Sequence, residues 1–189
     1  MKTPCIITIL SLAALGLASP AQADGYSPSE DANRRGIIIG GGLHGGHIDI
    51  DCGDGCGGEL NEAGGAELHV TYMMSRKLGL SVEGWGMVHT TDTILGDVTA
   101  THVLATIGLQ YWALPRLWVR VGGGYARGEV TAGDITLQSE QVPGVALGVG
   151  FEILTSRTFA LDIQLRGGTG FYEDGNISNG AIGLGFSWF

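Results

Sequence analysis

Six charged residues stand in segments where large apolar residues alternate with small or polar ones: Glu67, Glu83, Arg120, Glu152, Asp162 and Arg166. Successive residues of an extended strand point to opposite faces, so these charges lie opposite the large apolar residues. Enclosed charges are costly unless they pair and form hydrogen bonds with one another. We therefore favour a structural network of charges inside the fold, in which Arg120, Glu152 and Asp162 form one cluster. A gated polar conduit is the alternative.

Four histidines are the next candidates for chemistry. His44, His89 and His102 stand at the ends of alternating segments, on the same face as the charges, and His69 stands deeper. Neutral imidazole is a common ligand of transition metals, and rings from neighbouring strands would meet at a narrow opening. Their spacing matches no zinc motif, so we favour hydrogen-bonded histidines and predict no metal site.

The sequence lacks the usual signals of catalysis and of nucleotide binding. It has no Gly-x-Ser-x-Gly elbow and no His-x-Ser pair, and the triple glycines at 40–42 and 122–124 precede no predicted helix that would hold a phosphate. The formal net charge of −9 argues against nucleic acid, whose phosphates require a basic surface. We predict no catalytic residue, no cofactor and no nucleic-acid partner.

The N-terminus predicts export from the cytoplasm. Lys2 precedes an uncharged apolar stretch at 6–17, and Ala21-Gln22-Ala23 has the small-x-small pattern that signal peptidase cuts. An uncleaved anchor is the alternative. The predicted organisation is a signal peptide, a short periplasmic segment and one domain, at residues 1–23, 24–35 and 36–189.

Two cysteines belong to the exported part, Cys52 and Cys56, within the stretch Asp51-Cys52-Gly53-Asp54-Gly55-Cys56. An exported chain meets an oxidising compartment, which favours a small disulfide loop between the two. A metal-binding pair is the alternative.

The domain repeats one unit, an alternating segment followed by a break that is tight and long in turn. The tight breaks are at 75–77, 113–116 and 155–158, and the long ones are at 48–64, 90–98, 128–141 and 173–179. The segments between them predict eight strands, at 36–47, 65–74, 78–89, 99–112, 117–127, 142–154, 159–172 and 180–189. Tilted strands of roughly 9–11 residues suffice to cross a bilayer.

The two faces of these strands differ in character. Leu147 and Val149 stand on one side of 142–154, and Gly148 and Gly150 stand on the other. A soluble sandwich or barrel, the alternative, would present Lys, Glu and Thr to water. Small residues inside and large apolar residues against lipid explain the pattern better. We predict an all-β fold, an eight-stranded antiparallel up-and-down transmembrane β-barrel.

The C-terminus and the strand pattern carry a family resemblance. The chain ends in Gly183-Leu184-Gly185-Phe186-Ser187-Trp188-Phe189, where Trp188 is in phase with Phe186 and Leu184. Residues 36–189 resemble the small outer-membrane barrels of the OmpA transmembrane-domain and OmpX type. The resemblance implies an outer-membrane location and insertion by the barrel-assembly machinery. It implies no particular function, because barrels of this size serve several.

Acidic residues gather in the predicted long loops, among them Asp49, Asp51, Glu59, Asp92 and Asp97. Solvated loops explain them most simply, and divalent cations that bridge them to lipopolysaccharide phosphates are the functional alternative. We predict a non-enzymatic outer-membrane barrel with a structural or surface-interaction role, in contact with membrane lipids and lipopolysaccharide. A narrow channel or transporter for small polar solutes is the first alternative, and a lipid A-modifying enzyme is the second.

Overall fold

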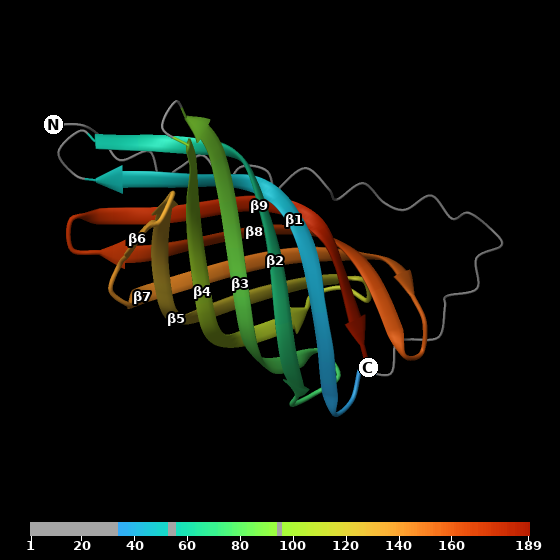
Figure 1. Ribbon diagram of the computed structural model, residues 1–189. Coiled ribbons are helices and arrows are strands. Elements are labelled where there is room, and N and C mark those ends of the chain that lie inside the picture. The colour runs from blue at the N-terminus through green and yellow to red at the C-terminus, as the bar shows by residue number, and fades with distance from the viewer. Residues whose placement is uncertain (1–33, 53–55, 94–95) are drawn as a thin grey trace, which may run out of the picture.

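The computed structural model describes residues 34–52, 56–93 and 96–189 (Figure 1). The predicted signal peptide, and all but the last two residues of the segment at 24–35, lie outside this part of the chain. The strands are β1 (Ile37–Cys52), β2 (Cys56–Met73), β3 (Leu78–Thr93), β4 (Gly96–Trp112), β5 (Leu117–Ala132), β6 (Ile135–Gln138), β7 (Val142–Thr155), β8 (Phe159–Tyr172) and β9 (Gly175–Trp188). Across the described residues, no helix is both long and apolar enough to span a membrane.

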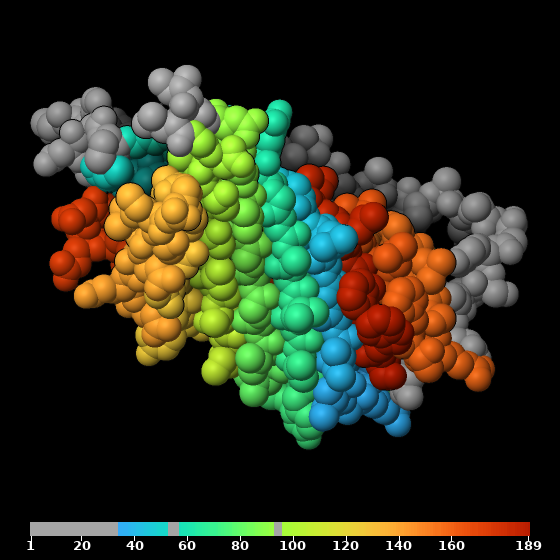
Figure 2. Space-filling model, viewed as in Figure 1, coloured from blue at the N-terminus to red at the C-terminus, as the bar shows by residue number. Residues whose placement is uncertain are grey.

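Eight of these strands close into a barrel. Each strand pairs antiparallel with its neighbours in the order β1-β2-β3-β4-β5-β7-β8-β9, and β9 pairs back onto β1 from Ile39↔Trp188 to Asp51↔Asn176. Closure leaves no unpaired edge in the ring, which is how such sheets avoid edge-to-edge association. Figure 2 shows β1 to β4 as one continuous wall. The predicted eight-stranded antiparallel barrel is confirmed.

The long connections differ from the sequence prediction, because most of their residues are strand. β1 and β2 run on together to the pair Cys52↔Cys56, and β3 and β4 run on to Thr93↔Gly96. The connection after β5 folds back as β6, which pairs with the outer end of β5 (Figure 1). An alternating pattern of side chains reflects what surrounds each face of a strand. Backbone pairing between two strands, in contrast, continues wherever the strands stay in register. The apolar pattern therefore ends before the strands do.

A β-bulge marks the point where the first long hairpin leaves the regular pattern. The register of β1 on β2 shifts between Gly46 and Ile48, and Glu62 on the opposite strand has a φ of 64°. One extra residue on a strand bends it and locally strengthens its twist. The shift brings Leu60 opposite Ile48, so that apolar side chains of both strands stay on the inner face.

Large apolar side chains cover the outside of the ring. Leu43 is 74 % exposed, Leu68 71 % and Ile107 62 %. The inner face is built from small and polar residues, and at several positions only glycine fits. A Cβ added at Gly150 would overlap the Trp118 ring. The lumen of an eight-stranded barrel is just wide enough to be filled by side chains, which this one is.

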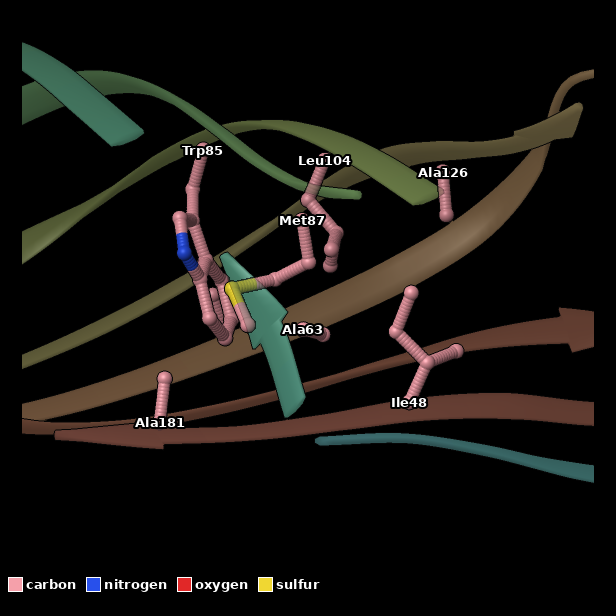
Figure 3. Close-up of a cluster of buried hydrophobic side chains, with 8 residues drawn as sticks. Ile48, Ala63, Trp85, Met87, Leu104, Ala126 and Ala181 are labelled. Atoms are coloured by element: carbon pink, nitrogen blue, oxygen red, sulfur yellow. The ribbon is translucent and has the colours of Figure 1, made fainter. Parts of the chain in front are cut away.

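Two apolar clusters occupy the lumen at different heights. One lies toward the long hairpins and contains Ile48, Ala63, Trp85, Met87, Leu104, Ala126, Ala146 and Ala181 (Figure 3). The other lies toward the tight turns and contains Ile38, Met73, Trp112 and Trp118, with Phe189 against it. Along β5 the order is Trp118, Arg120, Ala126, and along β2 it is Met73, Glu67, Ala63. The charged residues therefore form a layer between the clusters.

Candidate functional site: the layers of the barrel interior

Two arginines and two glutamates form the centre of the charged layer. Nη1 of Arg120 lies 3.2 Å from Oε2 of Glu67, and Nη1 of Arg166 lies 2.9 Å from the same oxygen. Both arginines also pair with Glu83, one with each carboxylate oxygen. All four side chains are at least 95 % buried. With two charges of each sign, the group is neutral as a whole.

This group connects opposite walls of the barrel. Glu83 lies on β3 and Arg166 on β8, and these strands stand four places apart around the ring in either direction. Arg120 on β5 and Glu67 on β2 are three places apart. Ion pairs that span the full width of the lumen hold its walls together. We call Glu67, Glu83, Arg120 and Arg166 the ion layer.

Amide and aromatic side chains orient the two guanidinium groups. Gln110 Oε1 accepts hydrogen bonds from Nε and Nη2 of Arg120, at 3.1 and 2.8 Å. Gln164 accepts one from Arg166 at 3.1 Å and donates one to Glu67 at 3.3 Å. Arg120 also lies over the Trp118 ring and Arg166 over that of Trp85. A buried ion pair is tolerated only with such additional hydrogen bonds, because desolvation otherwise outweighs the attraction between the charges.

The predicted cluster of Arg120, Glu152 and Asp162 does not form. Arg120 is paired with Gly148 on β7, and Gly148 is paired with Arg166 on β8, so the two arginines share one rung of the sheet. Glu152 and Asp162 share a rung four residues nearer the tight turns. Adjacent strands thus carry these residues at different heights, and the long Arg120 side chain reaches across the lumen instead.

Glu152 belongs to a separate group that closes the end of the barrel at the tight turns. Nη2 of Arg34 donates to Oε2 of Glu152 at 2.6 Å and to the carbonyl oxygen of Pro115 at 2.7 Å, and Trp112 donates to Oε1 at 2.9 Å. The Arg34 guanidinium also lies 5.1 Å from the ring centroid of Trp112 and 5.9 Å from that of Phe189. Sequence reasoning missed Arg34, because the alternating pattern begins only after it.

Asp162 is fully buried on the same rung as Glu152 but is not part of the ion layer. Its Oδ1 has no hydrogen-bond partner among the residues that the structure describes. All six predicted interior charges are buried, then, but only four of them pair with one another.

The four histidines are separated rather than gathered. His69 lies beside the ion layer, 3.3 Å from Glu67, and His44 contacts Gln164 at 3.4 Å. His102 bonds to Asn179 at 3.0 Å, and the half-buried His89 bonds to Thr91 at 2.6 Å. Within the described ranges, no group of three His, Cys, Asp or Glu residues is arranged to hold a metal ion. Facing the lumen does not bring side chains together when they stand at different heights.

The strand ends hold the two predicted disulfide cysteines and the C-terminal aromatic residues. The β1–β2 ladder places Cys52 directly opposite Cys56. The side chain of Cys56 lies outside the described part, so the disulfide stays a prediction. At the C-terminus, Trp188 is 53 % exposed on the outer face and meets the Phe186 ring edge to face, whereas Phe189 packs into the lumen near Arg34.

Comparison with known proteins decides the family. The family model described as "Outer membrane protein beta-barrel domain" matches residues 9–188. The chain belongs to this family. It is an outer-membrane β-barrel, so the large apolar residues of its outer face lie against lipid. In such barrels the short turns lie in the periplasm and the longer connections lie outside the cell. The Arg34 group lies at the end of the barrel with the short turns, and β6 lies at the end with the longer connections.

Solved structures agree with this fold. The outer-membrane β-barrel is similar to Ail of Yersinia pestis, crystallised with the heparin analogue sucrose octasulfate, with 15 % identity and a TM-score of 0.55 over 81 % of this chain and 99 % of that one. It is also similar to Neisserial surface protein A, with 12 % identity and a TM-score of 0.59 over 80 % and 96 %. No curated protein sequence matches the chain. At these identities the likeness shows the fold alone.

Proposed function

We propose that this outer-membrane β-barrel is a closed, non-enzymatic protein with a structural or surface-interaction role in the cell envelope. The ion layer is the observation that carries the proposal. Its charges compensate one another across the full width of the lumen, and the apolar side chain of Trp85 lies directly above it. A conduit for polar solutes needs charges that face water, whereas the charges of the ion layer are paired with one another.

The periplasmic end adds a second closure. Arg34 joins the segment before β1 to the β4–β5 turn through Pro115 and to β7 through Glu152. A solute would have to displace this arginine, pass the ion layer and then cross an apolar cluster. This sequence of obstacles disfavours the narrow channel as the main activity.

The hairpins that project outside the cell suggest the partner of such a surface role. Exposed acids stand directly opposite each other at two places, Asp49 with Glu59 and Asp92 with Asp97. Like charges directly opposite on paired strands are destabilising unless something compensates them. Divalent cations prefer carboxylate oxygens, so Ca²⁺ or Mg²⁺ bridging these pairs to lipopolysaccharide phosphates accounts for the arrangement.

Insertion by the barrel-assembly machinery is part of the same proposal. The aromatic residue that the machinery would meet on the lipid side is Trp188, because Phe189 packs inward.

Planar-bilayer recording of the purified mature protein tests the proposal. We expect a sealed membrane with no discrete current steps at any salt concentration. Steps that scale with salt would establish the channel instead. Mass analysis of lipid A from cells that express the protein covers the enzyme alternative, and an unchanged lipid A profile is expected.

A further inference from the structure

The outer mouth of the barrel, at the end with the longer connections, contains a partly open cavity of about 270 Å³. It adjoins the apolar cluster of Figure 3, because Ile48 belongs both to that cluster and to the cavity wall. Apolar cavities of roughly 150 Å³ lined by Leu, Ile and Phe bind molecules such as benzene. The cavity at the mouth therefore has room for one small molecule and not for a folded partner.

Branched apolar side chains from two parts of the ring line this cavity. Ile48 and Ile50 of β1 and Ile177 of β9 form one side, and Val130 and Leu137 form the other. Val130 and Leu137 are directly paired between β5 and β6, so the folded-back strand places a second apolar side chain beside the first. Leu137 is nonetheless 69 % exposed, and apolar surface of this kind is costly to leave in water.

Three polar side chains that line the cavity make their hydrogen bonds within the protein. Oγ of Ser139 accepts a hydrogen bond from the backbone nitrogen of Gly128 at 2.9 Å and donates one to the carbonyl oxygen of Glu140 at 3.0 Å. Nε2 of Gln138 donates to Oε2 of Glu129 at 2.7 Å. These groups therefore need no ligand to complete their bonding.

His102 also lines the cavity, but its ring nitrogens are directed elsewhere. Nδ1 lies 3.0 Å from Oδ1 of Asn179, and the enclosed Nε2 lies against Gly170 of β8, where an added Cβ would stand 3.1 Å from it. Thr101, the next residue of β4, belongs to the opposite face of the strand, because successive residues alternate. The side chains around the cavity thus offer an occupant carbon surface and no hydrogen-bond partner.

We propose that this cavity binds a small, free and wholly apolar molecule, such as a single hydrocarbon ring, that enters from the water-facing side at Leu137. Burial of its surface between the three isoleucines and the Val130–Leu137 pair stabilises the complex. A molecule with a polar group in its buried part would lose hydrogen bonds to water and gain none in return. This goes beyond the closed barrel proposed above, since the molecule is held at the mouth and does not cross.

Benzene and pyrazine are the probes for the test, because pyrazine has the same ring shape but two nitrogens that accept hydrogen bonds. The test uses the mature protein in phosphatidylcholine nanodiscs, with isoleucine methyl groups labelled for NMR. The ring current of either probe shifts the methyl groups that it contacts. The methyls of Ile48, Ile50 and Ile177 report the cavity, and those of the lipid-facing Ile107 and Ile163 report partition of the probe into the bilayer.

Benzene is expected to shift the three cavity methyls saturably, whereas the lipid-facing methyls shift without saturation. Its affinity should exceed that of pyrazine by about tenfold, because pyrazine would bury an acceptor without a donor. Unmoved cavity methyls would overturn the site, and equal affinities for the two probes would overturn its apolar character.

Two Ala→Leu variants on β4 form a matched pair. Ala100 lines the cavity, so Ala100→Leu fills it and should abolish the saturable shifts. Ala105 is exposed on the lipid-facing side, so Ala105→Leu should leave the benzene affinity unchanged. Leu137→Ser, at an exposed position, removes part of the wall and should weaken benzene by roughly fivefold. Saturable shifts that persist in Ala100→Leu, or that disappear in Ala105→Leu, would contradict the proposal.

An acyl chain of a neighbouring lipid is the other source of the same apolar chemistry. Nuclear Overhauser contacts between isoleucine methyls and lipid chains, recorded without benzene, detect it. We expect such contacts at Ile107 and Ile163 and none at the three cavity isoleucines. Contacts at the cavity methyls that added benzene displaces would assign the cavity to a lipid chain and overturn the free molecule.

Discussion

The middle of the lumen and its outer mouth are made by the same strands but are filled differently. In the middle, each guanidinium of the ion layer contacts both carboxylates, and amide side chains take up most of the remaining hydrogen bonds. At the mouth, apolar side chains surround open space. Compensated charges hold the walls of the barrel together, whereas the open space at the mouth leaves room for another molecule. One narrow barrel therefore combines a centre of compensated charges with an open outer end.

Loss of the central cation should have the largest effect. Arg120→Ala removes a partner from both Glu67 and Glu83 in a confined space, and breaking a buried ion pair typically costs about 3–5 kcal/mol. Urea unfolding in lipid vesicles measures the loss, with the exposed turn variant Arg76→Ala as the control. Current recordings on the same variant should stay silent. A stable Arg120→Ala barrel that conducts ions would show that the ion layer acts as a gate. It would contradict the contrast drawn between the middle of the lumen and its mouth.

Two leucines that are both exposed test where the lipid ends. Leu147→Arg places a charge on the outer face near the level of the ion layer and should cost about 2–4 kcal/mol in unfolding free energy. Leu137→Arg places the same charge at the water-facing mouth and should cost close to nothing. Equal losses in reversible unfolding would mean that β6 lies against lipid, and the cavity would then open sideways into the membrane.

The periplasmic closure should show an intermediate effect. Arg34→Ala leaves Glu152 with its bonds from Trp112 and Thr155 but without a counter-charge, at an expected cost of about 1–3 kcal/mol. The neighbouring Arg35 is exposed, which makes Arg35→Ala a matched control. The shift from the compact to the heat-denatured band on electrophoresis, followed against temperature, compares the two. Identical melting temperatures for the two variants would show that the Arg34 group adds no stability to that supplied by the ion layer.

The smallest effect is expected in the projecting hairpins. Removal of divalent cations from lipopolysaccharide-containing vesicles should lower the unfolding free energy by roughly 0.2–1 kcal/mol, the range for one cross-strand charge pair. Asp49→Asn should reduce this dependence, because it removes the repulsion with Glu59 and leaves the Asp92–Asp97 pair in place. Asp134→Asn, at an exposed turn between β5 and β6, is the control. Equal cation dependence in all three proteins would remove the cation bridge from the proposed function.

Much of this architecture follows from the sequence because a strand has a strict period of two. Alternation determined the eight strands of the ring, the lipid-facing position of Leu147 and the inward position of all six predicted charges. It also indicated why Gly148 and Gly150 occur where they do, since a narrow lumen tolerates few large side chains. These are local properties, readable from neighbours in the chain.

The partners of each inward side chain were decided only by the tertiary structure. Arg120 bonds to Glu67 three strands away and to Glu83 two strands away, and not to Glu152 on the next strand. Register sets the height of a residue, and the ring sets what lies across from it. The same holds for Arg34, which enters the lumen from outside the alternating pattern, and for β6, which turns a predicted loop into a cavity wall. The two-residue period of a strand predicts which face of the sheet a residue lies on. Only closure of the barrel decides which side chains it contacts there.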